Sequence, residues 1–270
     1  MMDITVGQYY PGESCVHKMD PRTKILSTLT FIMIVFLANT YLAYFILFGF
    51  IIAVTKTANL PLRLVAKSVK PLWLIVVMTF MVHIFTGKGD VLWAWKFLSL
   101  TQGGLQMGIM MSLRLIFLIV GSSLLTFTTS PIVLTDGIET LLRPFKCIGV
   151  PAHDLAMMMT IALRFIPTLL EETDKIMKAQ TARGADFASG NLLKKAKNLI
   201  PLLVPLFISA FRRADELATA MEARCYRGGE GRTRMHVMRF SNRDYFAFLA
   251  MLVLTVFLVF LKYFNTIRIS

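Results

Sequence analysis

Long stretches without a charged side chain constrain this chain more than any other feature of its sequence. The uncharged stretches are residues 25–55, 71–87, 104–127 (interrupted only by Arg114) and 245–261. A membrane-spanning helix needs about 20 mostly apolar residues, so the first stretch is too long for one straight span. Asn39 and Thr40 divide it into two short spans, at about 24–38 and 41–55. The sequence therefore predicts an all-α, polytopic membrane protein with about five transmembrane helices.

The composition agrees with a membrane protein that also has an aqueous part. Of the 270 residues, 56% are hydrophobic and 17% charged, whereas soluble domains average about 45–50% apolar and about 25% charged residues. The chain carries 29 Lys and Arg against 16 Asp and Glu, a net charge of +13. These values exclude an ordinary soluble enzyme, a disordered tail and a disulfide scaffold. The first residues lack a basic segment followed by an apolar core, so we expect no cleaved signal peptide.

The basic residues predict how the spans are oriented. Lys and Arg precede the first span and are frequent in residues 56–70, whereas the turn at Asn39 has none and residues 86–104 have few. Because basic residues accumulate on the cytoplasmic side, we expect a multi-pass membrane protein with a cytoplasmic N-terminus. The predicted regions are a membrane region of four spans (1–127), a cytoplasmic region (128–243) and a C-terminal transmembrane helix (244–270).

Two local features carry structural expectations. Asp20 is a good N-cap for the first span, with Pro21 at the first helical position, where its missing N–H costs nothing. Arg114 is the lone charge within a predicted span. Such a residue is by default a candidate functional site, and extension of its guanidinium toward one membrane face is the alternative.

Two long amphipathic helices are predicted in the cytoplasmic region. Residues 171–243 hold 14 Lys and Arg and 8 Asp and Glu. Within residues 155–183 and 193–224, mostly apolar residues recur at alternating steps of three and four, the spacing of one helix face. Charged residues argue against these helices crossing the membrane, so we expect them along or below its cytoplasmic face. The prolines expected to kink them are Pro167, Pro201 and Pro205.

The two amphipathic helices end alike. The first ends in Ala182-Arg183-Gly184 and the second, 41 residues later, in Ala223-Arg224-Cys225. One explanation is structural, because Arg favours the last helical turn and Gly favours the residue after it. The other is functional: two exposed guanidiniums insert into acidic or carbonyl-lined sites on a partner, for which a permanent charge and planar donors suit Arg. The periodicity alone leaves both explanations open.

At this point the chain resembles a known family, the transmembrane T components of energy-coupling factor (ECF) importers, called EcfT/CbiQ. The similarity covers nearly the whole chain and rests on motifs in a specific order. The motifs are residues 7–14 (GQYYPGES), 20–24 (DPRTK), 113–115 (LRL), 126–131 (TFTTSP), 162–167 (ALRFIP), 182–184 (ARG), 213–218 (RADELA) and 223–224 (AR).

The resemblance implies a set of membrane helices and long cytoplasmic coupling helices that end in Ala-Arg-Gly motifs. In the family these arginines dock into grooves on two ATP-binding-cassette (ABC) ATPase subunits. The residues implied to couple the chain to the ATPases are Ala182, Arg183, Gly184, Ala223, Arg224 and Cys225. Cys225 replaces the usual glycine. Because Cys is disfavoured at positive φ, the sequence does not settle how the second helix ends.

The resemblance also implies the function of a non-catalytic subunit without a cofactor. ATP-driven motion would pass to a separate substrate-binding membrane (S) subunit that delivers a vitamin, and a dedicated cobalt or nickel importer is the alternative within the family. Consistently, the sequence has no GxxxxGK[ST] phosphate-binding loop, and its histidines and cysteines have no metal-ligand spacing. Two other classes are a stand-alone secondary transporter or channel and a basic scaffold. Nucleic-acid binding is not expected, because residues 171–243 contain no dense basic run.

Overall fold

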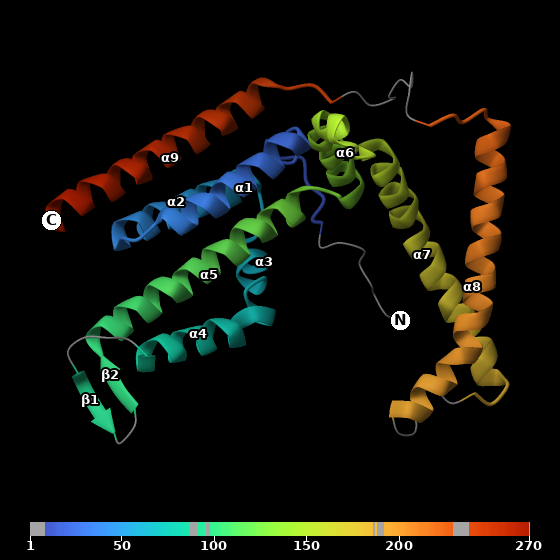
Figure 1. The fold of residues 1–270 in the computed structure, drawn as a ribbon, viewed down its shortest axis with the longest axis horizontal. Coiled ribbons are helices and arrows are strands. Elements are labelled where there is room, and N and C mark those ends of the chain that lie inside the picture. Colours follow the sequence, from blue (N-terminus) through green and yellow to red (C-terminus); the bar gives the residue numbers. More distant parts are fainter. Residues whose placement is uncertain are drawn as a thin grey trace. The chain divides into compact units, whose positions relative to one another are not determined.

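The computed structural model describes residues 9–86, 91–95, 98–185, 187, 192–228 and 238–269, and these are almost entirely helical (Figure 1). The helices are α1 (Pro21–Leu37), α2 (Tyr41–Thr57), α3 (Leu62–Lys67), α4 (Trp73–Thr86), α5 (Gln102–Thr128), α6 (Pro131–Leu142), α7 (Ala152–Ala182), α8 (Leu192–Ala223) and α9 (Asn242–Ile269), with 3-10 helices η1 (Lys70–Leu72) and η2 (Arg143–Ile148). The predicted all-α class is confirmed.

A short β-hairpin is the exception to the helical fold within the described ranges. Strands β1 (Val91–Trp95) and β2 (Leu98–Thr101) pair antiparallel, with Trp93 opposite Leu100 and Trp95 opposite Leu98. The uncharged stretches on either side predict only a loop between two spans here, so the hairpin corrects that expectation. An isolated two-stranded hairpin is marginally stable in water, and this one lies between α4 and α5 in the chain and contacts both helices. Its pairing therefore depends on contacts that the local sequence does not reveal.

The chain divides into two compact units. One, the apolar unit, comprises Gly7–Gly137 and Val237–Ser270, and the other, the amphipathic unit, contains Ile138–His236. The core of the apolar unit lies where α1, α2, α5 and α9 meet, and Ile34, Val35 and Leu47 are almost completely buried in it. Tyr44 stacks on Phe117 with 5.9 Å between ring centroids. This core forms because the uncharged stretches place apolar side chains all around each helix.

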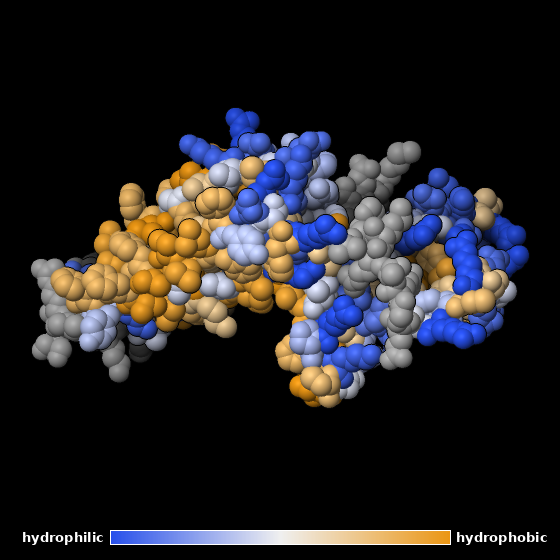
Figure 2. Space-filling model, turned by 90° about the horizontal axis from the view of Figure 1, so that it is seen from above, coloured by the Kyte–Doolittle hydropathy of each residue, from blue (hydrophilic) through white to orange (hydrophobic). Residues whose placement is uncertain are grey.

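Several helices are long and apolar enough to cross a membrane. Among the described residues they are Leu62–Thr86, Gln102–Thr128, Ala152–Ala182 and Asn242–Phe264, and Tyr41–Thr57 is a shorter apolar helix. Most side chains of α4 are exposed, including Trp73 and Met78. Figure 2 shows a broad hydrophobic surface over the apolar unit. The chain is thus a multi-pass membrane protein, because such a surface is stable only in contact with lipid or another apolar partner.

Helix α7 also meets these limits of length and composition, although we expected it outside the membrane. Its sequence contains Asp154, Arg164, Glu171 and Glu172, and charged groups within the hydrocarbon core are costly. The polar side chains follow one face, and the helix packs against α8. These features favour the amphipathic interpretation.

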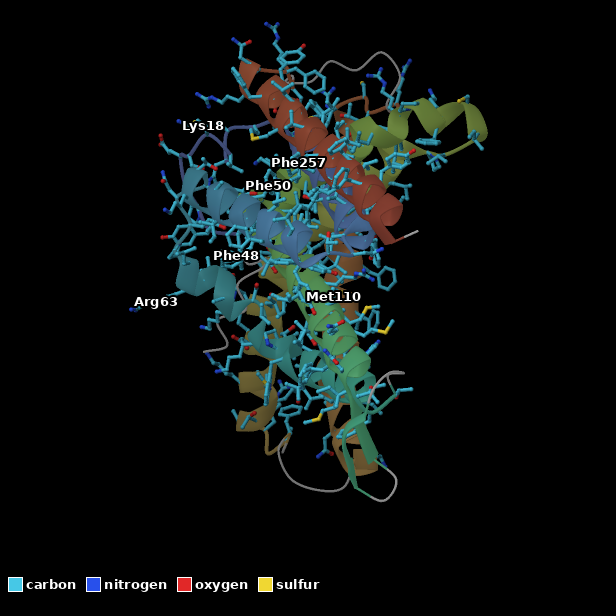
Figure 3. All side chains as sticks on the ribbon, turned by 90° about the vertical axis from the view of Figure 1, so that its left-hand side faces the viewer. Lys18, Phe48, Phe50, Arg63, Met110 and Phe257 are labelled. Atoms are coloured by element: carbon cyan, nitrogen blue, oxygen red, sulfur yellow. The ribbon has the colours of Figure 1, made fainter. Side chains whose placement is uncertain are left out.

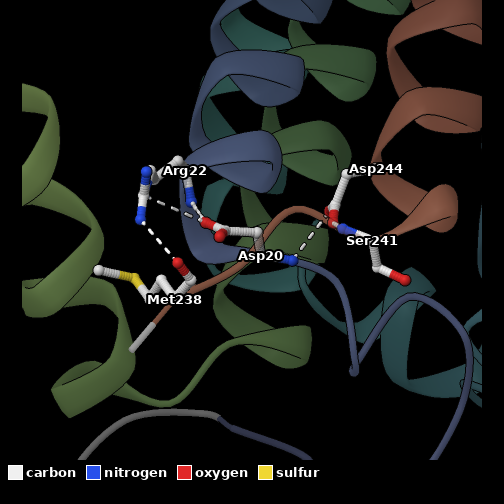
Figure 4. A network of polar contacts seen from close by, with 5 residues as sticks. All are labelled: Asp20, Arg22, Met238, Ser241 and Asp244. Carbon is white, nitrogen blue, oxygen red and sulfur yellow. Dashed lines mark hydrogen bonds and ion pairs between the residues drawn. The ribbon is translucent and has the colours of Figure 1, made fainter. Parts of the chain in front are cut away.

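A buried polar network joins the beginning of α1 to the beginning of α9 (Figure 4). As predicted, Asp20 caps α1, since its carboxylate accepts a hydrogen bond from the Arg22 N–H at 2.9 Å, and Pro21 is the first helical residue. The carboxylate of Asp244, 1% exposed, accepts hydrogen bonds from the N–H groups of Asp20 (2.9 Å) and Ser241 (2.8 Å). Arg22 donates to the Met238 carbonyl at 3.4 Å. The first and last membrane helices are therefore fastened together at one end.

Arg114 is held at the end of another helix. Its Nη2 donates to the Ala38 carbonyl at 3.2 Å and to Asn39 Oδ1 at 3.1 Å, directly after the last residue of α1. Its guanidinium also lies 5.9 Å from the centroid of the Phe36 ring. A cation near a helix C-terminus is favoured by the helix dipole. In this structure Arg114 bridges α5 to the end of α1.

Candidate functional site

The end of α7 has the hydrogen-bond pattern of a Schellman motif. The Gly184 N–H donates to the Thr181 carbonyl at 2.9 Å, and the Ala185 N–H donates to the Gln180 carbonyl at 3.0 Å. Gly184 has φ +89°, the left-handed conformation that this motif requires. Arg183 is consequently the last residue before the chain turns away from the helix axis.

The end of α8 repeats this pattern bond for bond. The Cys225 N–H donates to the Glu222 carbonyl at 2.9 Å, and the Tyr226 N–H donates to the Met221 carbonyl at 3.0 Å. Cys225 has φ +56°, so a residue with a side chain adopts the conformation that Gly184 has at the end of α7. The left-handed region costs a residue with a Cβ atom about 1–2 kcal/mol. Helix α8 therefore ends in the same cap as α7 although Cys225 replaces glycine, and the backbone of Cys225 is strained there.

Both arginines are exposed at these helix ends, together with Ala182 and Ala223 before them. The last carbonyls of each helix are satisfied by backbone N–H groups, so the arginine side chains are not needed as caps. Within the described part of the chain, neither guanidinium has a hydrogen bond or ion pair. The small alanines leave space beside each guanidinium. Each tip therefore presents a planar, permanently charged donor group that a partner can reach.

The two helices cross and contact each other at matching positions. Glu172 of α7 and Arg213 of α8 form an ion pair with 3.4 Å between Oε2 and Nη2, and both side chains are about one-third exposed. Glu172 precedes Arg183 by eleven residues, and Arg213 precedes Arg224 by eleven. At 1.5 Å per residue, each arginine lies about 16 Å from the ion pair along its helix. The crossing is visible in Figure 1, where the two tips point to different ends of the helix pair.

The bend in α8 agrees with its prolines. Figure 1 shows α8 changing direction in its first half, the half that contains Pro201 and Pro205. Each proline removes a helical hydrogen bond and disfavours a straight axis. Pro167 also lies inside α7. The structure keeps both helices continuous through their prolines, as the apolar spacing predicted.

A polar cluster that the sequence did not indicate attaches the end of α8 to α6 and α7. The Tyr226 hydroxyl donates to the Met157 sulfur at 2.9 Å and lies 3.4 Å from His153 Nε2. His153 Nδ1 lies 3.1 Å from Glu139 Oε1. A neutral imidazole protonated on Nδ1 would donate to Glu139, whereas the single proton of the Tyr226 hydroxyl is donated to Met157. The histidines have no metal-ligand spacing in the sequence, and contacts over such separations leave no local pattern.

The structure thus groups the six predicted residues into two separate triplets. Ala182, Arg183 and Gly184 end α7, and Ala223, Arg224 and Cys225 end α8. In the described ranges, no group of three or more His, Cys, Asp or Glu is arranged to hold a metal ion. Each triplet is exposed at the end of its helix.

Comparisons with known proteins agree with the ordered motifs. Residues 12–237 match the family model CbiQ, described as cobalt transport protein. The chain is 64% identical over 263 residues to the energy-coupling factor transporter transmembrane protein EcfT of Acidaminococcus fermentans, covering 97% of this chain and 98% of the relative. It is 49% identical over 264 residues to the protein of the same name from Bacillus subtilis, covering 97% and 100%.

These matches extend over almost the entire chain, including both amphipathic helices. They confirm the resemblance that the ordered motifs indicated, and they agree with a polytopic helical membrane component. The chain therefore belongs to the CbiQ/EcfT family and is the transmembrane T component of an energy-coupling factor transporter.

Proposed function

We propose that this T component transmits ATP-driven motion from two cytoplasmic ABC-type ATPase subunits to a separate substrate-binding membrane subunit. The observation that carries the proposal is the pair of helix ends with the same backbone hydrogen-bond pattern, each with an exposed arginine whose donors are not used within the described chain. The two helix ends present one guanidinium each, which is one for each of the two ATPase subunits. The chain supplies mechanical coupling and no catalytic step of its own.

Arg183 and Arg224 are the docking residues in this proposal. Their guanidiniums enter grooves on the ATPases and bind carboxylates or backbone carbonyls there, since such groups accept the parallel N–H donors of Arg. The neighbouring small residues, Ala182 and Ala223, permit close approach. Gly184 and Cys225 turn the chain away after the arginine, so that it does not block the groove.

The crossing of α7 and α8 supports the transmission step. The Glu172–Arg213 pair and the packing around it join the two helices between their tips. A displacement of either tip therefore moves both helices together rather than one helix end alone. The apolar faces of both helices include exposed Met158, Phe207 and Phe211, which offer a surface for the substrate-binding subunit or for lipid.

The topology that this function needs is the one that the basic residues predict. The N-terminus and residues 128–243 lie in the cytoplasm as the coupling region, residues 1–127 form the first membrane region, and residues 244–270 form the last span. We propose a vitamin as the transported micronutrient. A dedicated cobalt or nickel importer is the alternative, and the matched family model carries a cobalt description.

Charge reversal at the tips tests the docking role. Arg183→Glu and Arg224→Glu, singly and together, are compared with Arg212→Glu, which changes an exposed arginine on α8 that forms an ion pair with Glu216 one turn away. We expect the double variant to lose co-purification of the ATPases and ATP-driven uptake, with Arg212→Glu close to wild type. Normal assembly and transport by the double variant would disprove the docking role.

The same reconstituted system separates the other functions. Uptake into vesicles is measured with radiolabelled vitamins and with cobalt ions, with and without the ATPases and ATP. Uptake of cobalt alone would favour the dedicated metal importer. Uptake by the T component alone, without ATP, would establish a stand-alone transporter or channel.

A further inference from the structure

An apolar cavity of about 470 Å³ lies within the apolar unit, between α1, α2, α5 and α9. Cavities of about 300–1,000 Å³ are typical of sites that bind small organic molecules. Its inner walls are formed by Phe31, Phe50, Leu124 and Met251. None of the coupling residues proposed above lines it, so the cavity requires a separate explanation.

The cavity has a polar end and an apolar end. Its polar lining residues lie at the beginning of α1 and α9 and the end of α2 and α5, and they include Lys24, Thr57, Thr128 and Arg243. The apolar lining residues Phe31, Phe50 and Met251 lie seven or eight positions from Lys24, Thr57 and Arg243 in the same helices. At 1.5 Å per residue, this places the apolar end about 10–12 Å deeper. An occupant should therefore have a polar group at one end and a hydrocarbon chain at the other.

The two cations at the polar end differ in what they bind. Lys24 Nζ donates to the carbonyls of His17 and Thr128, both at 3.0 Å, so its donors are largely used within the protein. Arg243 is exposed, and in the described residues it has no hydrogen bond or ion pair. Its guanidinium is therefore available to an anionic group at the cavity entrance.

A hydroxyl group in the cavity wall is also available. Ser27 lines the cavity one helical turn deeper than Lys24, and its buried Oγ has no hydrogen-bond partner among the described residues. A buried hydroxyl without a partner is unfavourable, because no hydrogen bond compensates its loss of contact with water. An ester or phosphate oxygen just below a bound headgroup would accept its hydrogen bond and remove this cost.

We propose that the cavity binds one anionic phospholipid. The phosphate group lies beside Arg243, an ester or phosphate oxygen accepts from Ser27, and one acyl chain extends between Phe31, Phe50 and Met251. The assignment rests on the order of the lining groups from the entrance inward: the guanidinium of Arg243, the hydroxyl donor of Ser27 and then apolar side chains. Arg243 directly precedes the predicted last span, where basic residues attract anionic lipid by about 1 kcal/mol each. The bound lipid would brace the four helices around their shared core.

Lipid retention tests the site. The full-length protein is reconstituted with equal amounts of phosphatidylglycerol and phosphatidylcholine, extracted in mild detergent and examined by native mass spectrometry. We expect one retained phospholipid, mostly phosphatidylglycerol. Ala247→Leu with Ala250→Leu fills the cavity and should abolish retention. Arg243→Gln should lower the preference for phosphatidylglycerol about fivefold.

Matched variants outside the cavity serve as controls. Ala53→Leu adds the volume of one of the two leucine substitutions in the cavity on an exposed face of α2. Arg63→Gln removes an arginine that extends away from the helices, whereas Phe50 lies among them (Figure 3). Both controls should retain lipid like the wild type, and thermal unfolding verifies that all variants fold. Retention by the filled variant, or equal retention of the two lipids, would overturn the proposal.

The native thiol at the cavity distinguishes a lipid from a protein occupant. Cys15 lines the cavity and is exposed, so in a Cys147→Ser/Cys225→Ser background it is the single thiol. We expect phosphatidylglycerol to slow its reaction with a maleimide. If only the substrate-binding subunit slows the reaction, a helix of that subunit occupies the cavity and the lipid assignment is wrong.

Discussion

The ends of α7 and α8 have the same backbone and different surroundings. Both end in a Schellman motif with an arginine at the last helical position, about 16 Å from the shared ion pair. After the motif, α7 continues with Ala185, which has no polar side chain, whereas α8 continues with Tyr226, which binds Met157 and lies beside His153. The orientation of each arginine is thus set by the backbone, and the attachment of each tip is set by the next side chain.

The glycine at the end of α7 should be the more sensitive of the two turn positions. Gly184→Val places a β-branched residue at φ +89°, where nothing surrounds the added Cβ and the cost is backbone strain alone. We expect a local cost of about 2 kcal/mol and weaker co-purification of the ATPases. Gly184→Asn, which tolerates this region better, is the control. Equal binding by the valine and asparagine variants would show that the turn does not position Arg183.

The attachment of the α8 tip is tested by removing one hydroxyl group. Tyr226→Phe keeps the ring and deletes the hydrogen bonds to Met157 and His153, at a cost of about 1 kcal/mol. We expect a lower unfolding temperature and a more mobile Arg224 tip, measured by a spin label at Cys225. A label that is as immobile in the variant as in the wild type would show that the cluster does not hold this tip.

Relief of the backbone strain at Cys225 should stabilise the protein, in contrast to the two preceding substitutions. Cys225→Gly removes the penalty of a left-handed residue with a Cβ atom, although glycine adds freedom to the unfolded chain. We expect a net stabilisation of about 0.5–1 kcal/mol, seen as a higher unfolding temperature with unchanged ATPase binding. Destabilisation would mean that the thiol makes a contact worth more than the strain.

The smallest effect is expected at the crossing. Glu172→Gln and Arg213→Gln each remove one partner of a partly exposed ion pair, and the coupling in a double-mutant cycle should be about 0.2–1 kcal/mol. It should fall at high salt, because partly exposed charges are screened. A coupling of zero would leave apolar packing as the sole connection between the helices at this point.

The features that follow from local sequence were predicted correctly. Uncharged stretches indicated the apolar helices, steps of three and four indicated α7 and α8, and Asp20 with Pro21 indicated where α1 begins. These signals involve residues within a few helical turns of one another. The roles of the arginine triplets came from family resemblance and stay predictions.

The contacts that join distant segments could not be predicted. Tyr226 meets Met157, and Arg114 meets Ala38 at the end of α1, across separations that no periodicity describes. The β-hairpin was missed for a related reason, because its strands are short and it contacts the neighbouring helices. Tertiary packing, rather than propensity, decides such features.

The equal distance from the ion pair to each arginine has a mechanical consequence. If the crossing acts as a fulcrum, α7 and α8 are two arms of the same length, so a given force at either tip produces the same torque. In the proposed coupling, equal forces from the two ATPases would therefore contribute equally to the motion of the helix pair. If the two ATPases moved by different amounts, the helix pair would tilt at the crossing rather than rotate about it.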